Sequence, residues 1–255
     1  MKGYFLCYPN LPEGRVTTIL ISGEAVYLVS ALQALRIQPI LTLASDRLPK
    51  PVRFHPDMLC CYVGNGKAVV AAKEKQLQNR LECFDVQIIQ TEYPLGYQYP
   101  RDAGCNVLQI GEHVFYNPKS ADKTILQELE TKTLHRVSQG YSRCSVAVAD
   151  EHSAITADPG LAKAMKQAGL EVLEIQPGQI RLPGYDYGFI GGCCGLISPD
   201  RIAFTGSLEL HPDGERIKAF LFQRGISYVE LTNEPLLDIG GLIPLREERK
   251  YMGKG

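Results

Sequence analysis

The most unusual local sequence is Gly191-Gly192-Cys193-Cys194-Gly195, which places two adjacent thiols among three glycines. Glycine allows positive φ and a close approach of the backbone, so this run could present a thiol at a cavity wall. A thiolate is a strong nucleophile, and Cys193 or Cys194 is therefore a candidate catalytic group. The alternative is a tightly packed site with two inert thiols, because no group that lowers a thiol pKa is near them in the sequence.

Three carboxylates are candidates for binding a cation. Asp102 follows Arg101 just before a strand-like segment, where it could bind a ligand, cap a turn or pair with Arg101. Asp186 and Asp238 each precede a glycine-containing segment, and each could face a shared central axis or stabilise a turn. Both oxygens of a carboxylate can accept the planar fork of N–H donors that a guanidinium offers.

The other motifs predict no metal and no cofactor. No CxxC pair occurs among the eight cysteines, and most of these lie in apolar runs where a reduced cysteine acts as a small hydrophobic residue. The glycine run lacks the spacing of a dinucleotide-binding motif, and no phosphate-binding loop is present. His55 and His211 precede prolines in loops, and His113 and His152 lie in expected hairpin turns, so none is favoured as catalytic.

Composition narrows the class of protein. The chain has 255 residues with a formal net charge of -1, which does not favour a nucleic-acid or anionic-membrane partner. No apolar run approaches the roughly 18 residues that span a bilayer, and the apolar stretch before Pro9 is too short for a secretory signal. We therefore expect a cytoplasmic protein with one domain over residues 1–255, whose oligomeric state stays open.

The elements that would position these residues follow a repeated order. Residues 144–150 and 153–156 read as two short strands joined by the polar turn Glu151-His152. Asp158-Pro159 should begin a helix, because aspartate is a good N-cap and proline suits the first helical position. Gly169 should end it, and residues 170–175 alternate in polarity like a third strand. The unit is therefore strand-turn-strand-helix-strand.

The same order starts again near residues 58, 106 and 195, and residues 17–44 form a partial copy. Five similar units predict an α/β chain closed into a five-fold ring of ββαβ-type repeats, rather than an ordinary three-layer sheet. The charged residues 246–250 should form a solvated, frayed terminus. The turn anchors of the units are 41, 47, 39 and 49 residues apart: Gly23, Gly64, Gly111, Asp150 and Pro199.

Five such units around an axis resemble the guanidine-modifying enzyme superfamily, which is also called the pentein or α/β-propeller fold. Residues 99–104, Tyr-Pro-Arg-Asp-Ala-Gly, are similar to the Arg-Asp segment that precedes a strand in agmatine and arginine deiminases. The resemblance implies that Asp102 takes the guanidinium or amine of a ligand.

Two further segments resemble the catalytic segments of that superfamily and depart from them. Residues 183–189 are similar to the segment that supplies its histidine, but Tyr185 stands at the histidine position and Asp186 follows it. Residues 238–245 are similar to the Gly-Gly segment that carries its cysteine, but Pro244 stands at the cysteine position. Proline offers no nucleophile, and a tyrosine with a pKa of about 10 cannot replace histidine without a large shift.

The preferred interpretation is a divergent branch of this superfamily that lacks the usual catalytic cysteine and histidine. It would bind a small guanidino or amino-acid-like ligand in the central cavity. An active amidinohydrolase or amidinotransferase-like enzyme that uses Cys193 or Cys194 is one alternative, and a non-catalytic protein-interaction module is another. The expected ligand-binding residues are Arg101, Asp102, Tyr185, Asp186 and Asp238.

Overall fold

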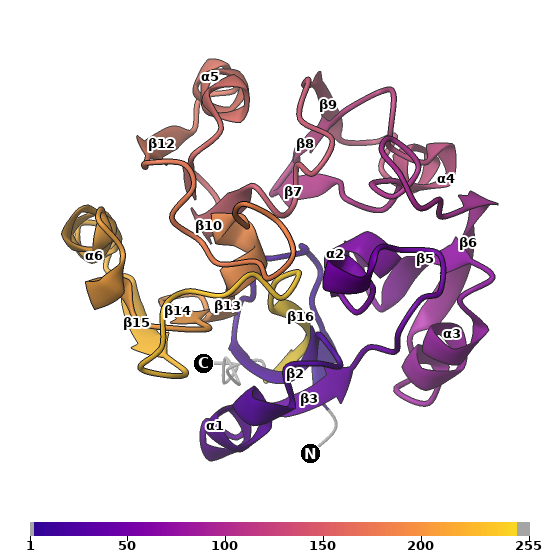
Figure 1. Ribbon diagram of the computed structural model, residues 1–255, viewed down its shortest axis with the longest axis horizontal. Coiled ribbons are helices and arrows are strands. Elements are labelled where there is room, and N and C mark those ends of the chain that lie inside the picture. Colours follow the sequence, from indigo (N-terminus) through magenta and orange to yellow (C-terminus); the bar gives the residue numbers. More distant parts are fainter. Residues whose placement is uncertain (1–2, 249–255) are drawn as a thin grey trace, which may run out of the picture.

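The computed structural model describes residues 3–248, and five small sheets, called blades here, surround a central axis (Figure 1). In each blade an inner strand pairs antiparallel with a middle strand, and a helix leads on to an outer strand parallel to the middle one. The inner strands contact one another around the axis. This is the predicted five-fold arrangement of ββαβ-type repeats.

Four blades are continuous in sequence. The first consists of β4 (Cys60–Gly64), β5 (Lys67–Ala72), α3 (Lys75–Glu82) and β6 (Gln87–Pro94). The second consists of β7 (Leu108–Ile110), β8 (His113–Tyr116), α4 (Lys123–Glu128) and β9 (Thr133–Arg136). The third consists of β10 (Val146–Asp150), β11 (Ser153–Thr156), α5 (Pro159–Gln167) and β12 (Glu171–Glu174). The fourth consists of β13 (Cys194–Ser198), β14 (Arg201–Phe204), α6 (Gly214–Phe222) and β15 (Ser227–Glu230).

The fifth blade joins the two ends of the described chain. Its middle and outer strands are β2 (Arg15–Ile21) and β3 (Gln38–Leu41), connected by α1 (Val29–Ala34). Its inner strand, β16 (Ile243–Glu248), comes from far along the chain. The short β1 (Tyr4–Phe5) pairs with the edge of β16 that faces away from β2. The remaining short helical segments are α2 (Pro56–Leu59) and the 3-10 turns at Val26–Leu28, Lys50–Val52, Ile190–Cys193 and Leu208–Leu210.

The prediction for the charged residues 246–250 was wrong over the part that the structure describes. Arg246–Glu248 belong to β16, and the Glu247 side chain is fully buried. Its Oε2 accepts hydrogen bonds from the backbone N–H groups of Glu13 and Gly14, at 2.6 and 2.8 Å. Ring closure explains the difference, because the opening blade needs an inner strand that its own segment does not contain. Lys250 lies outside the described residues.

The local signals in the sequence explain the hairpins and helices of the blades. Asn65 and Gly66 both have positive φ in the turn between β4 and β5, as a two-residue hairpin requires. The Asp158 side chain accepts a hydrogen bond from the Leu161 backbone N–H at the start of α5. Gly169, with a φ of +90°, ends that helix.

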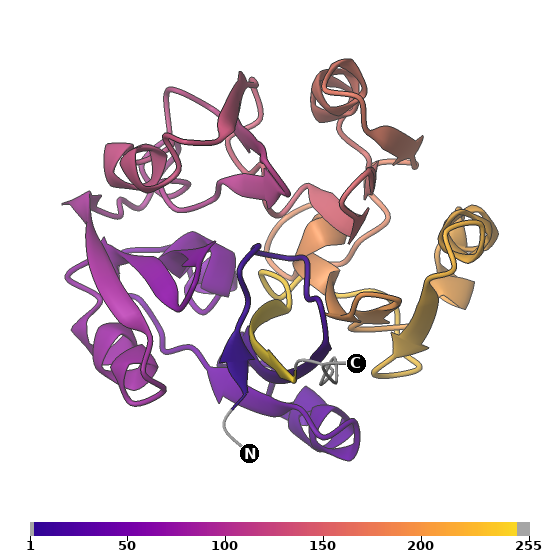
Figure 2. The ribbon, with the colours of Figure 1, turned by 180° about the vertical axis from the view of Figure 1, so that it is seen from behind.

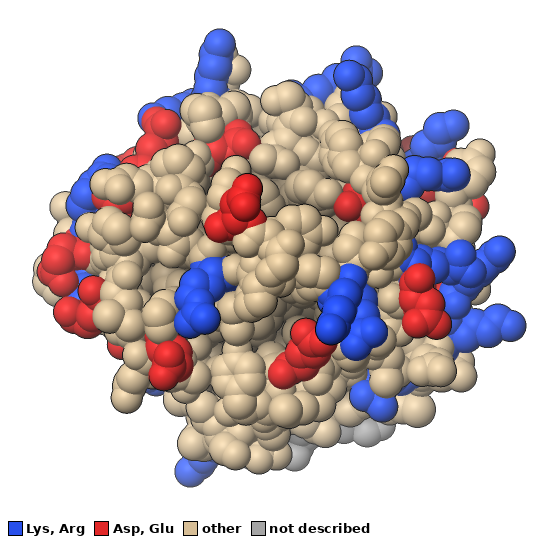
Figure 3. All heavy atoms as spheres, in the orientation of Figure 1, with Lys and Arg blue, Asp and Glu red and all other residues tan. Residues whose placement is uncertain are grey.

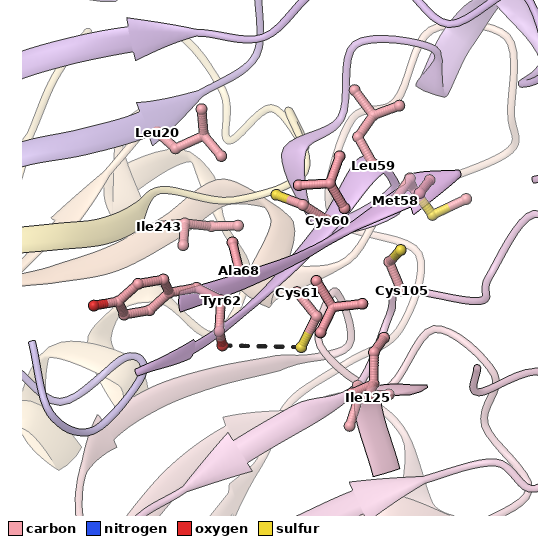
Figure 4. Packing of buried hydrophobic residues seen from close by; sticks show 14 of the residues in the cluster. Leu20, Met58, Leu59, Cys60, Cys61, Tyr62, Ala68, Cys105, Ile125 and Ile243 are labelled. Carbon is pink, nitrogen blue, oxygen red and sulfur yellow. Dashed lines mark hydrogen bonds between the residues drawn. The ribbon is translucent and has the colours of Figure 1, made fainter. Parts of the chain in front are cut away.

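Apolar side chains fill the space between neighbouring blades. Figure 4 shows one such cluster, in which β4 packs against Leu20 of β2, Ile243 of β16 and Ile125 of α4. Cysteines in these clusters act as small apolar residues, and none of those in residues 3–248 forms a disulfide. No helix of this described range is both long and apolar enough to cross a bilayer.

Residues 6–14, called the closing segment here, lie across the ring on the face seen in Figure 2. The Asn10 side chain donates to the Gln109 carbonyl of β7, and the Tyr62 hydroxyl of β4 donates to the Leu6 carbonyl. These contacts, with those of Glu247, cover the carboxyl-terminal ends of three inner strands. The opposite ends of the inner strands remain available for a site.

Candidate functional site

A cavity of about 270 Å³ lies where the chain leads into the inner strands. Each of its lining residues comes from a segment just before β4, β7, β10, β13 or β16, so all five blades contribute to it. Its lining residues are Val52, His55, Met58, Asp102, Tyr141, Cys144, Leu182, Tyr185, Asp186, Tyr187, Phe189 and Asp238. No lysine or arginine is among them, whereas three are aspartates.

Asp102 lies in the segment before β7 and is almost fully buried. Its Oδ2 accepts a hydrogen bond of 2.7 Å from the Tyr141 hydroxyl, which fixes the orientation of the carboxyl group. Its Oδ1 is buried without a hydrogen-bond partner among residues 3–248. Burial raises the pKa of Asp102, and the Tyr141 hydrogen bond opposes that shift. One oxygen is therefore committed to the protein and the other is available to a donor.

Asp238, in the segment before β16, is held by backbone N–H groups. Its Oδ2 accepts from the Phe189 N–H at 2.8 Å, and its Oδ1 accepts from the Gly240 N–H at 2.9 Å. A Cβ at Gly192 would lie 1.9 Å from Oδ1, so glycine is required there for the carboxylate to fit. The Nδ1 atom of His55 lies 3.7 Å from the same oxygen.

A third buried carboxylate, Asp57, lies behind the cavity wall in α2. Its Oδ2 accepts a hydrogen bond of 2.7 Å from the Cys144 thiol. The Cys144 sulfur also accepts from the Asn106 side-chain amide at 2.9 Å. The Asn106 Oδ1 accepts from the backbone N–H groups of Arg143 and Cys144, which holds the segment before β10 in place.

Burial decides the protonation of the groups around the cavity. It raises the pKa of Asp57 to about 7, and the Asp238 charge adds to this shift while the Arg143 charge opposes it. It lowers the pKa of His55, against the opposing effect of Asp238, so this imidazole is neutral at pH 7. It raises the pKa of Cys144 well above its ordinary value. The buried Arg143 guanidinium donates to the Gly191 carbonyl at 3.1 Å and supplies a positive charge nearby.

Aromatic rings form the outer wall of the cavity. Tyr141 stacks on Phe189 with ring centroids 6.1 Å apart, and Tyr187 meets Phe189 edge to face at 6.0 Å. The ring centroids of Tyr99 and Tyr141 lie 5.9 Å apart. Tyr185, which is 47% exposed, completes the rim of the cavity. Aromatic faces attract cations, so this wall is compatible with the carboxylates of the floor.

The structure brings four of the predicted ligand-binding residues together in this cavity: Asp102, Tyr185, Asp186 and Asp238. Asp102 and Asp238 lie in its floor, whereas Asp186 and Tyr185 are exposed at its rim. Arg101 does not line the cavity. It is exposed, and its guanidinium lies 5.7 Å from the centre of the Tyr93 ring.

Cys193 and Cys194 lie next to the cavity but not in its lining. Both thiols are buried and donate to the Ile190 carbonyl, at 3.1 and 3.2 Å. Burial raises the pKa of Cys193 well above its ordinary value and that of Cys194 to about 12. Both thiols are therefore protonated at neutral pH. A Cβ at Gly191 would lie 2.3 Å from the Val146 carbonyl oxygen, so the role of the glycine run is to let two backbones approach closely.

Sequence reasoning missed His55, Asp57, Tyr141 and Cys144. One signal was present for each of them: they lie within six residues before an inner strand, as Asp102 and Asp238 do. His55 was placed in a loop before Pro56, and Cys144 looked like the first residue of a strand. The repeat would have identified these positions if equivalent places in all five units had been compared.

Other parts of the described chain offer weaker sites. A neighbouring cavity of about 230 Å³ has one carboxylate in its lining, Asp158, which is used as the N-cap of α5. No three histidine, cysteine, aspartate or glutamate side chains in residues 3–248 are placed to hold a metal ion. Both signs of charge are scattered over the face in Figure 3, without a single-sign patch over its centre.

The model of a protein family described as "Family of unknown function (DUF6873)" matches residues 20–243. No curated protein matches the sequence. An inosamine-phosphate amidinotransferase from Streptomyces griseus has a similar structure, with a TM-score of 0.62 at 10% identity over 97% of this chain and 98% of that chain.

Two further solved structures are similar. For a mutant agmatine deiminase from C. jejuni with substrate bound, the TM-score is 0.60 at 9% identity over 96% of this chain and 97% of that chain. For a mutant DDAH from Pseudomonas aeruginosa in complex with citrulline, it is 0.54 at 11% identity over 89% and 96%. All three are pentein proteins, and the predicted pentein fold is confirmed. At these identities the likeness shows the fold alone.

Proposed function

The chain belongs to the family of unknown function DUF6873, and we propose that its central cavity binds a small cationic ligand with a guanidino or amino group. The observation that carries this proposal is the convergence of Asp102, Asp186 and Asp238 on a cavity whose lining contains no lysine or arginine. A carboxylate with one oxygen held by Tyr141 and the other unpartnered is suited to an N–H donor of such a ligand.

The cavity also favours a particular kind of guanidino compound. An amino-acid ligand carries a carboxylate, and this lining offers that group no positive side chain. A ligand with cations at both ends avoids this mismatch, since Asp102 and Asp238 could face one end and Asp186 the other. The aromatic rim would cover the apolar chain between them. Agmatine has this chemistry, and the named neighbours include an agmatine deiminase.

The residues at the family-type catalytic positions argue against the usual hydrolytic pair. Tyr185 lies at the rim with a pKa raised by burial and by the Asp102 charge, so it does not act as a base near pH 7. Pro244 is buried in β16, paired with Ile19 of β2. The proposed activity is therefore binding of the cationic ligand, without a cysteine and histidine at these positions.

Isothermal titration calorimetry with three probes tests this proposal. We expect agmatine to bind, and we expect both arginine and N-carbamoylputrescine, in which a neutral ureido group replaces the guanidinium, to bind more weakly. Asp102→Asn should weaken agmatine binding by about tenfold or more, because it removes a buried charge opposite the cation. Asp46→Asn removes the same charge from an exposed position elsewhere and should leave affinity unchanged. Absence of agmatine binding at millimolar concentration would refute the proposal.

A further inference from the structure

Cys144 differs from the other buried thiols in its surroundings. It lines the central cavity, and its thiol donates to a carboxylate, the Oδ2 of Asp57. The thiols of Cys60, Cys61, Cys193 and Cys194 donate to backbone carbonyls instead. Such carbonyl contacts leave no acceptor that could take the proton, whereas a carboxylate can take it.

The groups around this thiol form a cluster with unused capacity. The Asn106 amide donates to the sulfur at 2.9 Å and would stabilise a negative charge there. The Oδ1 of Asp57 is buried without a partner in the described part of the chain, as is the Oδ1 of Asp102 in the cavity floor. A buried carboxylate oxygen without a partner is costly, and the Asp102 oxygen belongs to a residue that lines the same cavity as Cys144, which indicates an N–H donor of a ligand in that cavity.

We propose that Cys144 is the nucleophile of this cavity, with Asp57 as its proton acceptor and Asn106 as the donor that stabilises the thiolate. The proposal rests on the proposed binding of a guanidinium or amidinium, whose carbon is the electrophile. It assigns chemistry to the segment before β10, and not to Pro244 of β16 or to the vicinal pair Cys193 and Cys194.

The step balances without a further reactant. The thiol proton moves to Asp57, the sulfur lone pair forms a bond to the guanidinium carbon, and one carbon–nitrogen bond of the ligand breaks. The departing nitrogen takes up one proton, so that an amine leaves, Asp57 returns to its starting state and an amidino group remains on Cys144. The net charge of the ligand's guanidinium passes to the new S-amidino group.

The unliganded and liganded cavities should differ in thiol reactivity. Without a ligand, burial and the negative charges of Asp57 and Asp238 keep the thiol protonated. A cation in the cavity offsets these charges and lowers the cost of forming a thiolate. A cationic electrophile should therefore react with Cys144 faster than a neutral one of the same shape.

Competitive labelling followed by peptide mass spectrometry tests the proposal on the folded protein. The probes are chloroacetamidine, which is cationic, and chloroacetamide, which is nearly the same size and neutral. We expect the cationic probe to be favoured at Cys144 by about tenfold, relative to the ratio of the two rates at the exposed Cys83. The vicinal pair should stay unmodified in both reactions.

Two variants separate the roles of the residues. Asp57→Asn should reduce the labelling of Cys144 and the preference for the cationic probe, while Cys194→Ser should change neither. Labelling of Cys144 at the same relative rate by both probes, or no labelling of it while Cys83 reacts, overturns the inference. Calorimetry with agmatine keeps the two proposals distinct: binding without Cys144 labelling refutes the nucleophile alone, and absence of binding refutes the cavity's proposed function.

Discussion

At the scale of single residues, the cavity depends on carboxylates that are kept from solvent. Asp57 is the most deeply buried of them, and burial is the largest cause of its raised pKa. The Arg143 charge opposes that shift. A protein that only needed stability would be served better by an apolar residue there, so this carboxylate is best explained by a role in the site.

Asp57 gives the protein a defined pH dependence. Its pKa is about 7 in the folded state and 3.8 ordinarily, so between these values the folded protein keeps a proton that the unfolded chain has released. The free energy of unfolding therefore falls as pH rises through this window. Asp57→Asn cannot ionise, and we expect it to remove this decline, which is at most about 1.4 kcal/mol per pH unit.

Urea unfolding of both proteins from pH 4 to pH 8 measures this difference. The variant should gain stability over the natural protein as pH increases, and the two curves should converge toward pH 4. Parallel curves throughout would contradict the raised pKa. Asp46→Asn, at an exposed position, is the matched control and should not change the slope.

At the scale of elements, each inner strand has two functional ends. The segment before it supplies the cavity, while its other end meets the closing segment in three of the blades. β16 shows why both ends matter, because it carries Asp238 just ahead of it and Glu247 near its end. The strand is therefore fixed at one end by ring closure and positions the site at the other.

Glu247 and Glu248 provide a matched pair of substitutions in β16. Glu247→Ala leaves the backbone N–H groups of Glu13 and Gly14 without their acceptor and should cost about 3 kcal/mol of unfolding free energy. Glu248→Ala removes only a partly exposed ion pair with Arg15 and should cost about 1 kcal/mol or less. Denaturant unfolding measures both, and equal losses would contradict the role given to the closing segment.

At the scale of the whole molecule, segments from all five blades line the one cavity that is proposed to bind the ligand. The blades contact one another mainly through apolar clusters and the inner strands. A bound cation would add a polar link among Asp102, Asp186 and Asp238, which are far apart in the sequence. Ligand binding should therefore stabilise the ring as a unit and not a single blade.

Hydrogen exchange and thermal unfolding with agmatine test this expectation. At a concentration of 100 times Kd, a ligand stabilises the folded protein by about 2.7 kcal/mol. The amide hydrogens of Phe189 and Gly240, which hold Asp238, should exchange more slowly although they lie in different segments. Protection confined to one segment would show that the ligand binds elsewhere.

Much of the fold could be predicted because its signals are local. The N-cap Asp158 and the stop at Gly169 act over a few residues, and each behaves as predicted. The inner strand of the opening blade could not be predicted, because its pairing joins residues more than 200 positions apart, such as Val16 and Glu247. Its charged sequence also resembles a solvated terminus.

By itself, the sequence determined the repeated unit, the number of its copies, and which aspartates could form a binding site if the fold brought them together. Periodicity and turn chemistry suffice for this, since they depend on neighbours in the chain. Only the tertiary structure decided which residues meet. It brought Cys144 to Asp57 across 87 positions and left Arg101 outside the cavity. Burial, which follows from the packing of five blades, then set the protonation of these groups.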